Sequence, residues 1–74
     1  MNKFMFQVVI EKDNDGYFAF CPALQGCYTQ GDSYEEVLEN IKDAIRLHVE
    51  DRLEEKTPIP SFQSVSLTAV EVRV

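Results

Sequence analysis

The side chains able to carry chemistry in this chain are two cysteines, a single histidine and many carboxylates. Cys21 and Cys27 are close in sequence and His48 is distant, so the three do not supply four ligands at the spacing of a structural zinc site. No second histidine is available to activate either thiol as a nucleophile. We therefore predict no metal, no cofactor and no catalytic residue, and we interpret both cysteines as reduced, small core residues.

Charge gives the first indication of a partner. Thirteen acidic residues against seven basic ones leave the 74-residue chain with a net charge of -6. A negative surface repels phosphate, so we expect no direct binding of nucleic acid. A basic protein is the natural complement, because opposite fields speed encounter and suppress wrong partners. The alternative is that the charge only keeps the domain in solution.

The chain has the length of one small domain, which we place at residues 1–74. No apolar run approaches the roughly 20 residues of a membrane-spanning helix. The first six residues, Met-Asn-Lys-Phe-Met-Phe, alternate like a strand and lack the features of a signal peptide. We therefore expect a cytoplasmic protein.

Three short strands are predicted in the N-terminal half. Alternating apolar residues indicate a strand over residues 3–12, and the turn sequence Asp-Asn-Asp-Gly at 13–16 predicts a hairpin to a second strand at 17–21. Pro22 ends that strand. A brief third strand is expected at 27–30, followed by Gly31, and all three glycines are interpreted as turn residues rather than as a phosphate-binding loop.

A long helix is predicted from about Ser33 to Leu53. Ser33 and Glu36 fit a capping box, with Asp32 as a competing cap. Leu47 departs from the pattern on the charged side, either as a stray exposed leucine or as part of a contact surface. One stripe at helical spacing contains Tyr34, Val37, Leu38, Ile41, Ala44, Ile45, His48 and Val49.

The valine-rich residues 65–74 predict a last strand after the prolines at 58 and 60, with a bulge near Thr68 or Ala69 or a later start. The order is β-β-β-α-β, an α+β fold. We expect an antiparallel three-stranded meander, one helix packed on one face, and a fourth strand parallel to the first through a right-handed crossover.

One helix covers only one face of such a sheet. The other face leaves apolar side chains such as Met5 and Val9 uncovered, and exposure of this kind usually marks an interface. We therefore expect a homodimer or a larger homo-oligomer, with Met5 and Val9 at the interface.

This element order is similar to the opening half of the ribonuclease H-like fold, whose enzymes place acids centrally on the first strand, on the helix and at the fourth strand. Here the centre of the first strand is Gln7-Val8-Val9. The remaining acids have end-of-strand or solvent-facing patterns: Glu11, Glu36, Glu39 and Glu71. A two-metal nuclease is not favoured, and we predict that the chain is not an enzyme.

Residues 16–37 combine a glycine, an aromatic strand, Pro-x-Leu-x-Gly-Cys, Thr-x-Gly-Asp-Ser and a Glu-Glu helix start. In this order the stretch resembles the signature of the HicB-like antitoxins, and the resemblance covers residues 3–53 and, more loosely, the last strand. It implies a truncated ribonuclease H-like fold without the catalytic carboxylates. It also implies a partner, a small basic HicA-like toxin that cleaves messenger RNA and whose catalytic histidine and RNA-binding face the antitoxin blocks.

Many members of that family add a C-terminal DNA-binding domain. Nothing up to Val74 fills that role, so we expect no operon repression and no DNA contact by this chain. The family's binding residues are not a compact motif. For each candidate taken alone, a place on a solvated turn or helix face explains the polar side chain more simply than a binding role. The candidates on matching elements are Asp13 and Asp15 in the first turn, Tyr28 and Gln30 on the third strand, and Glu35, Glu39 and Asp43 on the helix.

The sequence therefore predicts an antitoxin of a type II toxin-antitoxin system that binds and neutralises a small basic toxin. The alternative is a stand-alone dimeric domain that binds a ligand between helix and sheet, or retains weak metal-dependent nuclease activity. A short basic reading frame beside the gene would favour the first interpretation.

Overall fold

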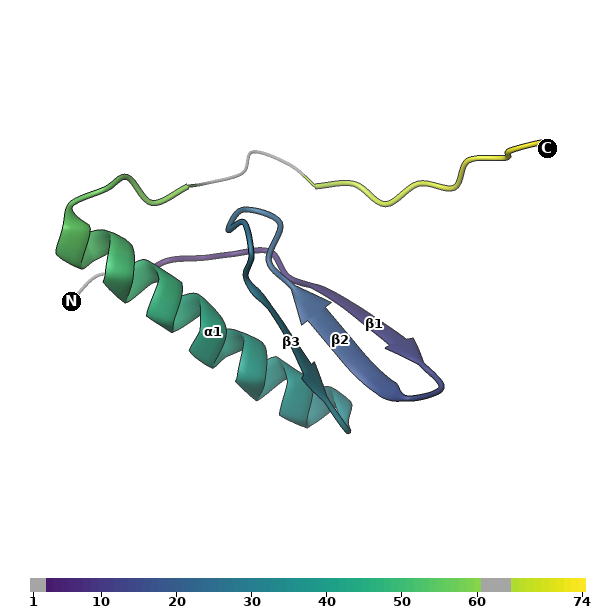
Figure 1. Ribbon diagram of the computed structural model, residues 1–74, viewed down its shortest axis with the longest axis horizontal. Helices are drawn as coiled ribbons and strands as arrows, with labels where there is room; N and C mark the ends of the chain where they lie inside the picture. Colours follow the sequence, from purple (N-terminus) through teal and green to yellow (C-terminus); the bar gives the residue numbers. More distant parts are fainter. Residues whose placement is uncertain (1–2, 61–64) are drawn as a thin grey trace.

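A computed structural model describes residues 3–60 and 65–74 and shows a three-stranded sheet followed by one long helix (Figure 1). The strands are β1 (Val9–Asp13), β2 (Gly16–Phe20) and β3 (Tyr28–Gly31), and the helix is α1 (Tyr34–Glu55). Both strand pairs are antiparallel and the sheet order is β1-β2-β3. The predicted α+β meander with one helix on one face is thus confirmed.

The first hairpin turns where the sequence predicted it. Asp13 pairs with Gly16 across the turn, and the backbone N–H of Asp15 donates to Asp13 Oδ1 at 2.8 Å. Gly16 has a φ of 140°, a conformation that favours glycine. The strand is shorter than predicted, because its ladder begins with Val9 opposite Phe20. Residues 3–8 continue beyond the end of β2, where the chain turns away at Cys21, so no described strand lies opposite them.

The loop between β2 and β3 folds back on itself through backbone hydrogen bonds. The Cys21 N–H donates to the Cys27 carbonyl at 3.0 Å, and the Leu24 N–H donates to the Cys21 carbonyl at 3.1 Å. The Cys27 N–H completes the set by donating to the Leu24 carbonyl at 3.1 Å. These bonds direct Leu24 toward the helix, where its side chain is only 1% exposed.

Helix α1 starts as the sequence predicted. Ser33 is the N-cap, and its Oγ accepts from the Glu36 N–H at 3.0 Å. Glu36 Oε1 accepts from the Asp32 N–H at 3.3 Å, so Asp32 takes part through its backbone rather than as the cap. The helix ends two residues later than expected, at Glu55, with Lys56 in the left-handed conformation at φ 59°.

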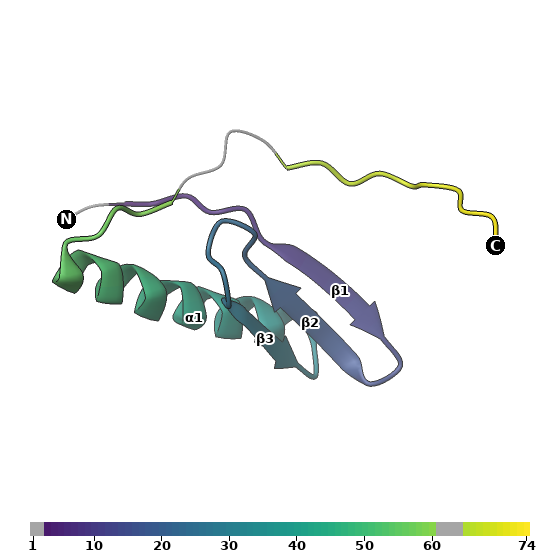
Figure 2. The same ribbon diagram turned by 45° about the horizontal axis from the view of Figure 1, so that its top comes forward.

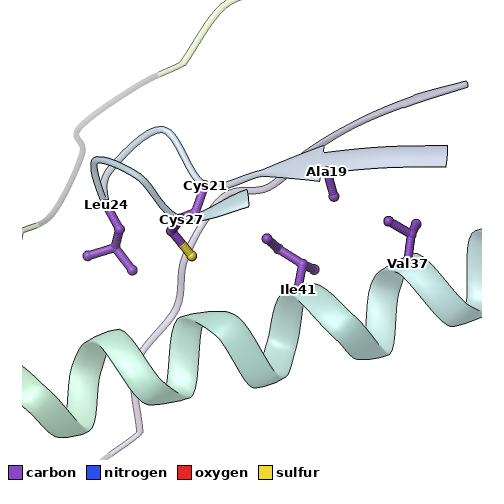
Figure 3. Close-up of a cluster of buried hydrophobic side chains, with 6 residues drawn as sticks. All are labelled: Ala19, Cys21, Leu24, Cys27, Val37 and Ile41. Carbon is purple, nitrogen blue, oxygen red and sulfur yellow. The ribbon is translucent and has the colours of Figure 1, made fainter. Parts of the chain in front are cut away.

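The core lies between one face of the sheet and α1, and Figure 3 shows its side chains pointing toward one another. Both cysteines belong to it, as predicted, and both are free thiols 2% exposed. Fully burying a side chain of the size of Leu24 or Ile41 contributes about 1.5–3 kcal/mol. The buried cluster is Ala19, Cys21, Leu24, Cys27, Val37 and Ile41.

The fourth strand expected over residues 65–74 is absent from the described structure. These residues form no ladder with β1, and every one of them is exposed. Figures 1 and 2 show them as a separate extended trace that joins no strand of the sheet in either view. The alternating valines have the composition of a strand, but a strand needs a hydrogen-bonded neighbour, and this stretch has none among the described residues.

Candidate functional site

An acidic hollow of about 290 Å³ lies where the β1–β2 turn meets the junction of β3 and α1. The two parts come together because Gly16 and Gly31 approach closely: a Cβ added at Gly16 would lie 2.9 Å from the Gly31 carbonyl oxygen. Four carboxylates line the hollow, namely Asp13, Asp15, Asp32 and Glu36, beside Tyr17, Phe18 and Gln30.

Local hydrogen bonds hold parts of the hollow in place. Asp13 accepts from the N–H of Asp15, and Glu36 accepts from the N–H of Asp32, so two carboxylates are oriented by backbone donors. No lysine or arginine lines the hollow. A lysine or arginine of a partner would find carboxylate acceptors there, and charge-assisted bonds of this kind are about twice as strong as neutral ones.

The sheet face that α1 leaves uncovered carries an aromatic cluster. Phe18 and Phe20 are adjacent on this face of β2, with ring centroids 6.1 Å apart. Tyr28 of β3 stacks on Phe18 at 6.0 Å and is 63% exposed. Phe18 also lines the acidic hollow, so the carboxylates and the aromatic rings form one continuous surface. We call the hollow and this aromatic cluster together the acidic–aromatic face.

A second acidic surface runs along α1. Glu35, Glu39 and Asp43 follow one another at four-residue spacing and are all exposed. Glu39 contacts Lys42 at 3.4 Å, and Asp43 contacts Arg46 at 3.0 Å. Exposed pairs of this type contribute about 0–1 kcal/mol to stability. These acidic side chains therefore contribute more to the electrostatic field around the molecule than to the stability of the fold.

The structure thus brings some predicted candidates together and leaves others apart. Asp13, Asp15 and Gln30 line the hollow, and Tyr28 belongs to the adjoining aromatic cluster. The helix candidates Glu35, Glu39 and Asp43 do not line it. Of the proposed interface residues, Met5 is 97% exposed, and Val9 lies half-buried opposite Phe20 on the uncovered face.

Sequence reasoning did not assign several residues to the acidic–aromatic face. Asp32 and Glu36 were interpreted only as capping residues, although their carboxylates also line the hollow. Phe18 and Phe20 were predicted to lie on the second strand, but their side chains were not assigned to either face of the sheet. Strand alternation was the available signal, because it puts them on the side opposite Ala19 and Cys21.

Two further structural findings concern the part of the chain that is described. Across residues 3–60 and 65–74, no group of three His, Cys, Asp or Glu side chains is placed to hold a metal ion. Within the same residues, no helix combines the length and the apolar character needed to cross a membrane.

Comparison with known families supplies the decisive observation. A family model described as the HicB-like antitoxin of bacterial toxin-antitoxin systems matches residues 6–72. The chain belongs to this family. The match includes both the sheet–helix unit and part of residues 65–74.

Relatives of this HicB-like chain occur in bacteria and archaea. A UPF0150 protein of Helicobacter pylori strain J99 is 44% identical over 68 residues, covering 92% of this chain and 94% of the relative. A UPF0150 protein of Archaeoglobus fulgidus is 41% identical over 69 residues, with 92% and 94% covered. A Synechocystis UPF0150 protein is 48% identical over 56 residues, with 74% and 71% covered.

A solved structure of the HicA3 and HicB3 toxin-antitoxin complex contains a chain with a similar fold. The TM-score is 0.64 at 26% identity, and the match covers 82% of this chain and 72% of that chain. The similar chain therefore comes from an assembly of a toxin with its antitoxin.

Proposed function

We propose that this HicB-like chain is the antitoxin of a type II toxin-antitoxin pair and neutralises a small basic HicA-like ribonuclease by binding it. The observation that carries the proposal is the family match over residues 6–72. The similarity to a chain of the HicA3 and HicB3 complex adds support, because it extends to a protein that is found with a toxin.

We assign the toxin contact to the acidic–aromatic face. A lysine or arginine of the toxin enters the hollow and bonds to Asp13 and Asp15, while Tyr28 and Phe18 provide apolar contact area beside it. At protein interfaces a few well-packed residues carry most of the binding energy, and tyrosine and arginine are enriched among them. The carboxylates occupy the positive surface on which the toxin would otherwise hold RNA phosphates.

Charge on the rest of the chain assists this encounter. The net charge of -6 attracts a basic toxin from any direction, and Glu35, Glu39 and Asp43 extend the negative field along α1. Binding in this mechanism requires no catalytic group or cofactor in the antitoxin, and it takes place in the cytoplasm, where messenger RNA is the toxin's substrate.

Co-expression with the product of a neighbouring basic reading frame tests the proposal. The intact chain should restore growth, preserve messenger RNA and co-purify with the toxin. The double variant Asp15→Lys with Tyr28→Ala should lose rescue, because it removes an acceptor and an exposed anchor without touching the core. Glu54→Lys, an equal charge reversal on an exposed residue of the last helical turn, serves as the matched control and should still rescue.

Failure of the intact chain both to restore growth and to co-purify would show that it is not an antitoxin for that toxin. If the intact chain rescues and the double variant rescues equally well, the function stands but its assignment to the acidic–aromatic face is wrong.

A further inference from the structure

The apolar stripe of α1 is wider than the three-stranded sheet that covers it. A groove of about 730 Å³ remains between the segment at residues 4–8 and the helix. Most of its lining is apolar, and the apolar lining residues are Phe4, Met5, Phe6, Val8, Leu38, Ile41, Ile45, Val49 and Leu53. We call this the β1-side groove, because its lining residues 4–8 lead into β1, an edge strand that has β2 as its one neighbour among the described residues.

Residues 65–74 have the complementary property. Their apolar side chains project into solvent, with Leu67 98%, Val70 77% and Val72 74% exposed. An extended, valine-rich stretch that pairs with no described strand is a template for strand pairing. The same chain therefore carries an uncovered groove beside a free strand edge and an uncovered strand-like segment.

The size of the molecule shows how much surface is left open. Its accessible surface is 6470 Å², whereas a compact monomer of this length exposes about 4,700 Å². Its radius of gyration is 14.4 Å, against about 11 Å for a compact domain of the same length. The surplus of roughly 1,800 Å² exceeds the roughly 800 Å² that each partner contributes to a standard interface.

Hydrogen bonds and two prolines restrain the start of the connection after α1. Thr57 Oγ1 and the Thr57 N–H both donate to the Arg52 carbonyl, at 3.3 and 2.9 Å, and an Arg52 guanidinium N–H donates to the Pro58 carbonyl at 3.4 Å. Pro58 and Pro60 each fix φ and restrict the residue before them. The described start of the connection, residues 56–60, is therefore restrained, and a restrained hinge favours exchange of a segment between two copies.

We propose that residues 65–74 of one copy add as a strand to the free edge of β1 in a second copy, and that the exchange is reciprocal. Val70, Val72 and Val74, which share one face by alternation, fill the β1-side groove of the partner copy. The fourth strand expected from the sequence thus forms between two chains and closes both grooves in a twofold dimer.

The dimensions agree with this arrangement. Ten extended residues span about 33 Å, and the helix stretch from Leu38 to Leu53 that lines the groove spans about 22 Å. The strand also supplies backbone partners for the edge of β1 that faces away from β2. The acidic–aromatic face shares no lining residue with the β1-side groove, so filling the groove leaves that face open. The proposal does not depend on toxin binding.

Light scattering of the purified full chain is the first test. The wild type should have twice the chain mass at micromolar concentration. The variant Val70→Asp with Val72→Asp should shift to the monomer mass, since two carboxylates cannot enter an apolar groove. Leu47→Asp is the matched control: Leu47 is 63% exposed on α1 and does not line the groove, so this variant should stay dimeric. A monomeric wild type overturns the proposal.

The second test keeps the proposal decidable even if the double variant does not fold. Chains labelled with ¹⁵N and with ¹³C are refolded together, and isotope-filtered NOEs are recorded on the wild type. Contacts between residues 70–74 of one label and residues 8–12 of the other support strand exchange. NOEs found only within one label overturn the proposal. A monomer in which an added apolar ligand occupies the groove also overturns it.

Discussion

Gly31 lies against the first turn of α1 so closely that a Cβ added to it would be 2.7 Å from the backbone N of Val37 and 2.9 Å from the Val37 Cα. Val37 itself is completely buried in the core. This approach places the end of β3 directly on the helix start, and it positions Asp32 and Glu36 at the edge of the acidic hollow. The geometry of the candidate site therefore depends on the absence of a side chain at Gly31.

Replacing Gly31 by alanine should destabilise the fold by about 1–3 kcal/mol, the usual cost of an overpacked contact that cannot relax. The new Cβ meets backbone atoms of a buried turn rather than a flexible side chain. Urea unfolding followed by circular dichroism measures the change. Gly26→Ala is the control, because Gly26 has a φ of 79° with nothing within 4 Å of the added Cβ, and backbone strain alone should cost about 1 kcal/mol. Unchanged stability in Gly31→Ala would contradict the close approach.

Replacing Ser33 by alanine should cost about 0.5–2 kcal/mol, because the Glu36 N–H loses the side-chain acceptor of the N-cap. Ser33→Asp keeps an acceptor at the same position and should retain most of the stability. The measurement is the midpoint of thermal unfolding for the three proteins. Equal loss in both variants would mean that the hydroxyl has another role than capping.

The pH dependence of stability should carry a signature of Cys27. Burial, with a smaller contribution from the neighbouring Cys21, raises the pKa of the Cys27 thiol above its ordinary value of 9.0. The folded protein then keeps the proton while the unfolded chain releases it, so stability is full below that value and falls as pH rises through it. The free energy of unfolding should decline less between pH 8 and 10 in Cys27→Ala than in the wild type. Parallel curves would argue against a raised pKa.

Reversing Glu35, Glu39 and Asp43 together to lysine should slow association with a basic toxin, by roughly tenfold at low salt. The effect should nearly vanish at about 1 M salt, where the Debye length is only about 3 Å. Stopped-flow association rates measured across a salt series provide the test. A loss that persists at high salt would indicate that this strip makes direct contacts with the toxin.

The purified chain should neither cleave RNA with magnesium or manganese nor shift a fragment of its own promoter at physiological salt. The reasons are the negative net charge and the absence, among the described residues, of three clustered metal ligands. Gel assays of RNA integrity and DNA mobility test both statements. Metal-dependent cleavage that disappears on replacing Glu11 or Glu71 by glutamine would support a nuclease instead.

Local patterns in the sequence were sufficient for the meander and the helix. The Asp-Asn-Asp-Gly turn, the Ser33–Glu36 spacing and the helical stripe each act over a few residues, so they determine structure without knowledge of the rest of the chain. The resemblance of residues 16–37 to HicB-like antitoxins gave the family, which the match over residues 6–72 confirms.

Other features were decided only by the tertiary structure. The acidic hollow joins Asp13 and Asp15 of one turn to Asp32 and Glu36 beyond β3, and the pairing of β2 with β3, with Gly16 close to Gly31, brings them together. The valines of residues 65–74 favour a strand, but composition does not determine which strand pairs with it. Pairing depends on which strand edge is open and within reach of the segment, and those are properties of the folded chain in three dimensions.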